Sequence, residues 1–252
     1  MEHSIQSVSF RLDPDEVHIW WVALDLPLRS LPEQITLLST DENARAQRFR
    51  FERHRRRYIA GRACLRRLLG GYLGLDPAQI QFDYSPQGKP SLKKNIHGKV
   101  LQFNLSNSED RALIAFRWQH LVGVDLEYVH PILDEDDLAR QFFCASETAL
   151  IHSLTGDEKN RKFFELWTCK ESLLKAMGAG LSRPINEVEV ALQDGSARLV
   201  SIAGDSLQAA SWRFALFQPA FGYQAALALE GPPCRIIFCP AVDEVKLKTS
   251  LL

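Results

Sequence analysis

Two charged side chains one helical turn apart, Glu171 and Lys175, lie in the run WTCKESLLKAMGAGLS at 167–182. With about 100° per residue, the apolar residues from Phe163 to Met177 fill one wide arc of the predicted helix. On the same wheel Glu171 and Lys175 fall at the edge of that arc, at about 80° and 120°. A carboxylate and an ammonium group at the border between a buried face and solvent form an acid and base pair, and such a border is where a cleft would lie.

A second acidic element is LVGVDLEYV at 121–129, whose alternating pattern predicts a strand. Gly123, Asp125 and Glu127 then point to one face of it. Two carboxylates on one strand face repel each other unless a cation lies between them, and hard oxygen ligands of this kind suit Mg²⁺. A solvated outer face is the structural alternative, and the Glu171 helix weighs against it.

Length and charge set the frame for this chemistry. The chain has 252 residues, 46% of them hydrophobic, and a formal net charge of −1, which argues against a general polyanion binder. Between Arg45 and Arg67 there are ten arginines and one acidic residue, whereas Asp125 to Glu147 is acidic. The two regions could meet across a site for a phosphate-rich ligand and its metal, or they could be two solvated faces that never meet.

The five cysteines are odd in number and have no CxxC spacing, so we expect a cytoplasmic protein and no zinc site. The N-terminal residues show no signal pattern, and nowhere do 18 apolar residues follow one another. We therefore expect a soluble protein that does not enter a membrane.

The predicted elements occur twice in the same order. We expect an α+β fold built as a pseudo-dimer of two βαααβββ halves, residues 1–119 and 120–252, with the site at their interface. Aligning Gly61-Arg62 with Lys170-Glu171 gives one register for the repeat. The first unit has strands near 17–25, 79–84, 100–105 and 111–118 and helices near 30–39, 41–52 and 54–73. The second has strands near 121–129, 187–193, 197–202, 211–218 and 222–229 and helices near 134–143, 146–154 and 158–177.

Two loop motifs could supply phosphate donors. SPQGKPSL at 85–92 combines two prolines with a glycine, which predicts a stiff loop between strands that holds Lys89. FNLSNS at 103–108 ends a strand with Ser and Asn, whose side chains and nearby amides can donate to phosphate. A solvated lysine and an ordinary capped turn are the alternatives.

Four motifs, GKP at 88–90, FNLS at 103–106, GVDLE at 123–127 and WTCKESLLKAMGAGL at 167–181, together resemble the Sfp-type 4′-phosphopantetheinyl transferases. This family has a pseudo-dimeric α+β fold made from two similar halves. The resemblance implies a Mg-dependent holo-[acyl-carrier-protein] synthase. A serine of an apo carrier protein would attack the phosphorus that bears pantetheine in coenzyme A, giving holo carrier protein and adenosine 3′,5′-bisphosphate.

The resemblance also implies a role for each motif residue. Asp125, Glu127 and Glu171 match the metal ligands of the family. Glu171 would also take the serine proton, and Lys175 would bind the pyrophosphate. The residues that would hold coenzyme A are Arg45, Arg53, Tyr84, Ser85, Gly88, Lys89, Pro90, Asn104, Leu105, Ser106, Asn107, Asp125 and Lys175. For Arg55, Arg56 and Arg57 we expect a solvated face, while Arg62 would contribute at most from the same helix.

Two positions fit less simply. Where the family usually has His after the FNLS serine, this chain has Asn107, which lacks a positive charge toward a phosphate, so we expect weaker binding of coenzyme A. Lys170 falls inside the apolar arc, where an unpaired ammonium group is costly, so we expect it to reach a carboxylate or to extend past the core.

The expected partners are coenzyme A and apo carrier proteins of the acyl, peptidyl or polyketide type, with no nucleic acid, no membrane and a monomeric enzyme. Two other classes remain open. A nucleic-acid binder could use the Arg45 to Arg67 run, but no interleaved aromatic motif accompanies it. A metal-dependent phosphohydrolase could use the three carboxylates without any acceptor protein.

Overall fold

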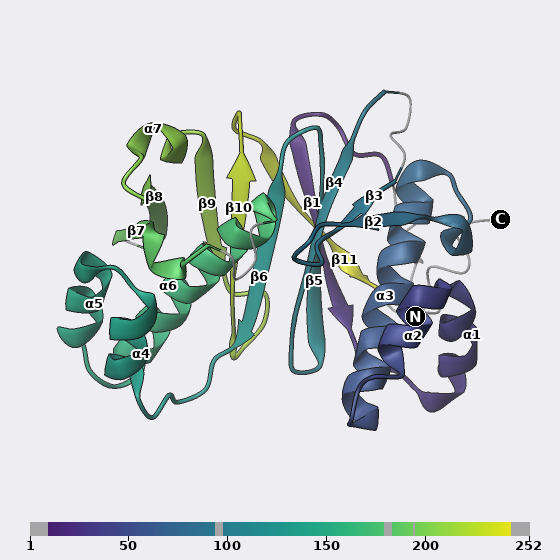
Figure 1. The fold of residues 1–252 in the computed structure, drawn as a ribbon, viewed down its shortest axis with the longest axis horizontal. Helices are drawn as coiled ribbons and strands as arrows, with labels where there is room; N and C mark the ends of the chain where they lie inside the picture. Colours follow the sequence, from purple (N-terminus) through teal and green to yellow (C-terminus); the bar gives the residue numbers. More distant parts are fainter. Residues whose placement is uncertain (1–9, 94–97, 179–182, 194, 243–252) are drawn as a thin grey trace, which may run out of the picture.

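The first half of the chain places a layer of helices against a layer of strands (Figure 1). The computed structural model describes residues 10–93, 98–178, 183–193 and 195–242. The elements of this half are β1 (Glu16–Ala23), a 3₁₀ turn (Leu28–Ser30), α1 (Leu31–Leu37), α2 (Thr40–Ala46), α3 (Glu52–Leu73), a second 3₁₀ turn (Pro77–Gln79), β2 (Phe82–Tyr84), β3 (Pro90–Leu92), β4 (Leu101–Ser108) and β5 (Arg111–Trp118). Strands β1, β5 and β4 are neighbours in one sheet, and β2 pairs with β3 in a separate hairpin.

The second half repeats this plan, including the hairpin, and adds one short helix and a last strand (Figure 1). Its elements are β6 (Val122–Tyr128), α4 (Glu135–Phe142), α5 (Ala145–His152), α6 (Gly156–Met177), a 3₁₀ turn (Ile185–Glu187), β7 (Val188–Gln193), β8 (Ser196–Ile202), α7 (Ser206–Ala209), β9 (Trp212–Phe217), β10 (Tyr223–Glu230) and β11 (Arg235–Val242). Strands β6, β10 and β9 form the second sheet, and β7 pairs with β8. The predicted α+β fold with two similar halves is confirmed.

The last strand does not stay in the half that the sequence predicts for it. β11 pairs in parallel with β1, so the first sheet has the order β11, β1, β5, β4. The predicted boundary of 120–252 therefore needs a correction, because residues 235–242 complete the sheet of the other half. The physical reason is that the otherwise open edge of β1 gains backbone partners from β11.

Each half has one long helix that a buried glutamate fixes to a short helix. Both α3 and α6 have 22 residues, and each is followed by a left-handed glycine, Gly74 at φ 63° and Gly178 at φ 68°. In the first half Glu42, in the capping box of α2, binds Arg66 Nε at 2.6 Å. In the second half Glu147, in the capping box of α5, binds Lys170 Nζ at 2.6 Å. The expectation that Lys170 reaches a carboxylate is confirmed.

These matching pairs also change the register of the internal repeat. The buried cation of α3 is Arg66 and that of α6 is Lys170, at the same position in two helices of equal length. Lys170 therefore corresponds to Arg66 and not to Gly61, which was the predicted partner. The difference arises because amphipathic helices resemble one another in several registers, whereas buried ion pairs fix only one.

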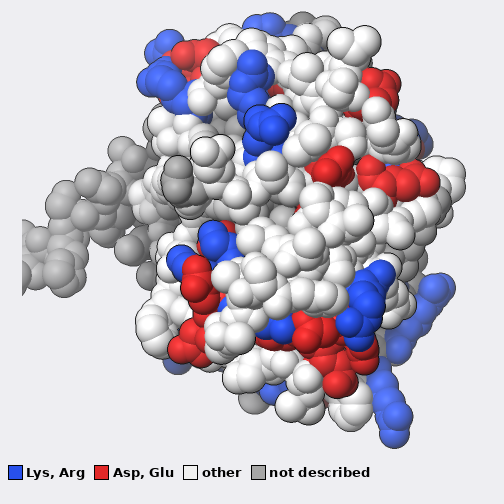
Figure 2. Space-filling view, turned by 90° about the vertical axis from the view of Figure 1, so that its left-hand side faces the viewer, with Lys and Arg blue, Asp and Glu red and all other residues white. Residues whose placement is uncertain are grey.

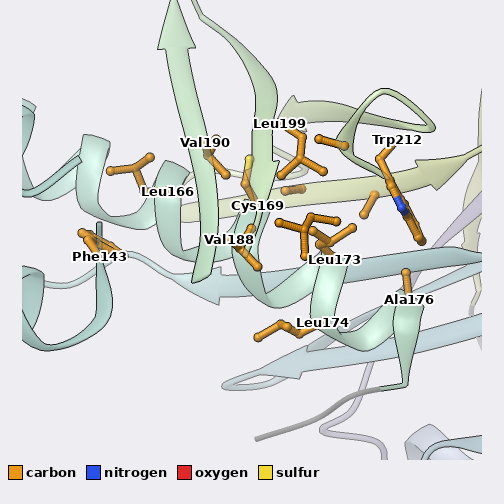
Figure 3. Packing of buried hydrophobic residues seen from close by; sticks show 14 of the residues in the cluster. Phe143, Leu166, Cys169, Leu173, Leu174, Ala176, Val188, Val190, Leu199 and Trp212 are labelled. Atoms are coloured by element: carbon orange, nitrogen blue, oxygen red, sulfur yellow. The ribbon is translucent and has the colours of Figure 1, made fainter. Parts of the chain in front are cut away.

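Helix α6 is buried on most of its circumference. Leu166, Cys169, Leu173 and Ala176 follow at spacings of three and four and belong to one core with residues of β7, β8 and β9 (Figure 3). The helix keeps a half-buried stripe at intervals of four residues, which consists of Trp167, Glu171 and Lys175. The predicted position of Glu171 and Lys175 at the rim of the apolar face is confirmed.

The acidic run after β6 forms local ion pairs. Asp136 accepts from Lys159 at 2.6 Å, and Asp137 pairs with Arg140 on the same helix. Positive and negative side chains stand beside one another on the face that Figure 2 shows. The acidic run is thus explained by its own neighbours on α4 and α6. Among the described residues, no helix combines the length and the apolar character needed to span a membrane.

Candidate active site between the two halves

The two sheets meet along a seam between β4 and β6, each of which lies at the edge of its own sheet (Figure 1). Between these two strands, side-chain oxygens of β4 accept the hydrogen bonds that backbone carbonyl groups accept within a sheet. Every second amide of β6 donates to a side-chain oxygen of β4, and the residue numbers rise together, so the two strands run in parallel. The bonds run from Val124 to Asn104 Oδ1 at 2.9 Å, from Leu126 to Ser106 Oγ at 3.3 Å and from Tyr128 to Ser108 Oγ at 3.0 Å.

Helix α6 reaches this seam because Gly123 of β6 has no side chain. A Cβ atom at Gly123 would lie 1.9 Å from Ser172 O and 2.6 Å from Ala176 N, distances at which no side chain fits. The backbone of α6 therefore lies directly on β6. This contact brings Lys175 to Asp125, two residues beyond the glycine, and explains the glycine of the GVDLE motif.

A three-way junction joins β4, β6 and α6. Lys175 Nζ lies 2.5 Å from Asp125 Oδ1 and donates to Ser106 Oγ at 2.7 Å. Ser106 Oγ in turn donates to Asp125 Oδ1 at 3.0 Å. Since Ser106 also accepts from the amide of Leu126, its hydroxyl group uses its full hydrogen-bonding capacity. One residue from the first half and two from the second are thus held within bonding distance.

The other two predicted carboxylates are half-buried around this junction. Burial raises the pKa of Glu171, the charge of Asp125 raises it further, and Lys175 acts in the opposite direction. Burial also raises the pKa of Glu127, again with a contribution from Asp125. The Glu127 carboxylate accepts from Ser108 Oγ at 3.0 Å and interacts with the side chain of Trp167. These shifts show that Asp125 acts electrostatically on both glutamates.

The chemistry of these donors fits a hard divalent cation. The Asp125 side chain is only 2% exposed, and its Oδ2 atom is buried without a hydrogen-bond partner, which is costly for a carboxylate. Three desolvated carboxylates are also the ligand type that Mg²⁺ prefers. The described residues contain no group of three His, Cys, Asp or Glu side chains already arranged to hold a metal ion.

A pocket of about 220 Å³ lies in the first half beside the junction. It is bounded by side chains of α3, by the β2–β3 hairpin and by β4. Its basic and hydrogen-bonding groups would suit an anionic ligand with polar rings. The lining residues are Leu24, Arg45, Arg57, Tyr58, Gly61, Arg62, Tyr84, Gly88, Pro90, Asn104, Leu105, Asn107 and Ala112.

Seven predicted ligand-binding residues line this pocket, namely Arg45, Tyr84, Gly88, Pro90, Asn104, Leu105 and Asn107. Arg53 is exposed in the first turn of α3 and does not line it. Ser85 instead closes the hairpin loop, because its hydroxyl accepts from the amide of Lys89 at 3.1 Å. Ser106 belongs to the junction. The predicted stiff loop between strands is confirmed, with Gly88 at φ 83°.

Sequence reasoning missed an arginine that a bidentate ion pair holds at the pocket. Arg57, expected on a solvated face, donates twice to Asp25 at 2.8 Å. Arg62, which donates to Glu42 and to Tyr84 Oη at 3.2 Å, also lines the pocket. The four-residue spacing from Arg57 to Gly61 and from Tyr58 to Arg62 could have identified this helix face. Asp25 is too distant in sequence to be predicted as a partner of Arg57.

Lys89 connects the two halves. Its Nζ atom donates to Ala176 O at 2.6 Å, in the last turn of α6, where a cation is favoured by the helix dipole. Burial lowers the pKa of Lys89 to about 8. Lys89 does not line the pocket.

Comparisons with known proteins agree on one family. Residues 121–228 match the family model described as the 4′-phosphopantetheinyl transferase superfamily, and residues 28–119 match a model of the 4′-phosphopantetheinyl transferase N-terminal region. A holo-(acyl-carrier-protein) synthase from Bacillus anthracis, solved in complex with CoA (3′,5′-ADP), is 18% identical with a TM-score of 0.36, covering 44% of this chain and 96% of that one.

Curated relatives show higher identity. The 4′-phosphopantetheinyl transferase HetI from Nostoc sp. is 47% identical over 178 residues, which cover 71% of this chain and 75% of HetI. The 4′-phosphopantetheinyl transferase Sfp from Bacillus subtilis is 30% identical over 182 residues, which cover 70% of this chain and 78% of Sfp. The matches favour a transferase over both alternatives, the phosphohydrolase and the nucleic-acid binder.

Proposed function

The chain belongs to the 4′-phosphopantetheinyl transferase superfamily, and we propose on this premise that it transfers the 4′-phosphopantetheine group of coenzyme A to a serine of an apo carrier protein. The products are holo carrier protein and adenosine 3′,5′-bisphosphate. The observation that carries the proposal is the junction of Ser106, Asp125 and Lys175, which joins both halves beside a basic pocket.

The pocket is the proposed site for the nucleotide end of coenzyme A. Arg45, Arg57 and Arg62 offer guanidinium groups, which bind phosphate through paired donors. Tyr58 and Tyr84 offer aromatic faces, and Asn107 offers an amide. Because Asn104 and Leu105 line the pocket and Ser106 follows them in β4, a ligand in the pocket can extend toward Lys175 along this strand.

The second-half residues would then carry out the transfer. The serine Oγ of the carrier forms a bond to phosphorus while the bond from phosphorus to the oxygen of the adenosine bisphosphate breaks. Glu171 accepts the serine proton, directly or through a water molecule. The ammonium group of Lys175 stabilises the charge on the departing phosphate, because it is a point charge one helical turn from Glu171.

Asp125, Glu127 and Glu171 would hold Mg²⁺, which when bound supplies positive charge to neutralise the pyrophosphate. The single-chain origin of the junction supports a monomeric enzyme, since both halves that form it belong to one polypeptide. The cysteine pattern supports a cytoplasmic location.

The test is mass spectrometry of apo carrier protein incubated with coenzyme A, Mg²⁺ and the purified chain. We expect the carrier to gain one phosphopantetheine group, at a rate that falls about 100-fold or more in Glu171→Gln. Glu158→Gln, an exposed glutamate in the first turn of the same helix, is the matched control and should keep the native rate. A carrier that stays unmodified under saturating conditions would contradict the proposal.

A further inference from the structure

The seam between β4 and β6 contains a repeated arrangement, and the proposed transfer gives no role to one of its members, Ser108. Two serines of β4, two residues apart, each make the same pair of bonds to β6. Ser106 accepts from the amide of Leu126 and donates to Asp125, and Ser108 accepts from the amide of Tyr128 and donates to Glu127. Each hydroxyl thus links a backbone amide of β6 to the carboxylate that precedes it.

We propose that Ser108 is a positioning residue that fixes the Glu127 carboxylate for metal binding. The Ser108 hydroxyl lies 3.0 Å from Glu127 Oε2 and 3.0 Å from the amide of Tyr128. The amide of Tyr128 occupies one lone pair of the oxygen, and the proton lies toward the Glu127 carboxylate, which accepts it. The hydroxyl is therefore held as a donor toward the carboxylate.

The surroundings of Glu127 explain why its carboxylate needs the hydrogen bond from Ser108. This side chain is half-buried near the Asp125 carboxylate, which repels it, and it has three rotatable bonds. Apart from Ser108, the side chain of Trp167 is the other hydrogen-bond partner that acts on it. Without the hydroxyl, Glu127 would keep the contact with Trp167 alone against the repulsion from Asp125. A carboxylate held near Asp125 needs to move less to share a cation with it.

Asn107, between the two serines, points to the other side of β4 and lines the pocket. Ser106 and Ser108 therefore face the two carboxylates, while Asn107 between them faces the pocket. This inference rests on the proposed function for the identity of the site, but its test measures metal binding separately from the transfer reaction.

The test compares Mn²⁺ binding to the full chain and to Ser108→Ala, measured by the loss of the electron paramagnetic resonance signal of free Mn²⁺, with and without coenzyme A. We expect Ser108→Ala to bind Mn²⁺ about 10-fold or more weakly, as is typical when a ligand loses its supporting hydrogen bond. Ser108→Thr keeps the hydroxyl group and should restore most of the affinity.

Ser201→Ala is the matched control, because Ser201 of β8 donates to Glu189 at 3.2 Å in a strand pair outside the site. It should leave Mn²⁺ affinity unchanged. If Ser108→Ala does not fold, Ser108→Cys keeps the shape with a weaker donor and should show the same loss. Equal Mn²⁺ affinity of the native chain and of a folded Ser108→Ala or Ser108→Cys variant would overturn the inference.

The outcomes also separate this inference from the proposed function. A native chain that leaves carrier protein unmodified, but whose Mn²⁺ affinity falls in Ser108→Ala, would reject the transferase and keep the positioning role. A native chain that modifies carrier protein, but whose Mn²⁺ affinity is indifferent to Ser108, would reject the positioning role alone.

Discussion

At the scale of single residues, Lys89 links a loop of the first half to helix α6 of the second half. Its ammonium group bonds to the last turn of α6 from a loop of the other half, and burial lowers its pKa to about 8. A phosphate near this loop would bind the charged form only. The proposed role of Lys89 in holding coenzyme A therefore depends on pH within an accessible range.

We expect the Michaelis constant for coenzyme A to rise as the pH increases from 7 to 9. With a pKa of about 8 in the free protein, the charged fraction of Lys89 falls as the pH passes through that value, by about tenfold over this range. Steady-state kinetics at fixed carrier concentration measure the effect. In Lys89→Arg the side chain stays charged over this pH range, so the Michaelis constant of this variant for coenzyme A should rise less. A native profile as flat as that of Lys89→Arg would contradict the prediction.

The sequence motifs predict which residues belong to the site better than they predict which residues contact one another. Asp125 and Lys175 were predicted from one strand and one helix, and the structure brings them together. The sequence does not reveal the ion pair of Arg57, because its partner Asp25 is distant in sequence. It places Ser108 in a motif of phosphate donors, because the contact of Ser108 with Glu127 depends on how β4 and β6 meet. Residue types follow from chemistry, whereas partners depend on which elements the fold brings together.

At the scale of elements, periodicity predicts helices α1 to α6 and most strands, but not the single-turn helix α7. β3 was missed because Pro90 and the preceding glycine indicate a turn, and β11 because its pairing with β1 is formed across almost the whole chain. The seam between β4 and β6 could not be predicted either. A strand whose edge is joined to another sheet by side chains has the same alternating sequence pattern as an ordinary strand.

The contact between β6 and α6 leads to a prediction about stability. Gly123→Ala should lower the free energy of unfolding by about 3 kcal/mol or more, because a Cβ atom would lie 1.9 Å from Ser172 O and neither backbone can yield. Chemical denaturation followed by circular dichroism measures the change.

Gly61→Ala in α3 is the control for this measurement. Its Cβ would lie 3.5 Å from Leu24 Cδ2, which is an ordinary contact, and alanine favours a helix over glycine by about 0.5 to 1 kcal/mol. This variant should be at least as stable as the native chain. Equal stability of Gly123→Ala and the native chain would show that α6 does not lie directly on β6.

At the scale of the whole molecule, the two halves correspond strand by strand. β1, β5 and β4 have the same order and antiparallel pairing as β6, β10 and β9. If the two halves were related by a strict twofold axis, β9 would contact β1 in the same way as β4 contacts β6. That side of β1 is taken by β11, and Phe238 of β11 contacts Phe217 of β9 with ring centroids 5.2 Å apart.

β11 therefore breaks the symmetry of a duplicated fold and occupies what would be a second cleft. The strand equivalent to β6, β1, carries the apolar residues Trp20 and Val22 on one face, whereas β6 carries Asp125 and Glu127 on one of its faces. We expect isothermal titration calorimetry to give a stoichiometry of one coenzyme A per chain, since the pseudo-equivalent position is filled. A value of two would require a second site that this asymmetry excludes. One strand thereby turns a repeat with two potential sites into an enzyme with a single site.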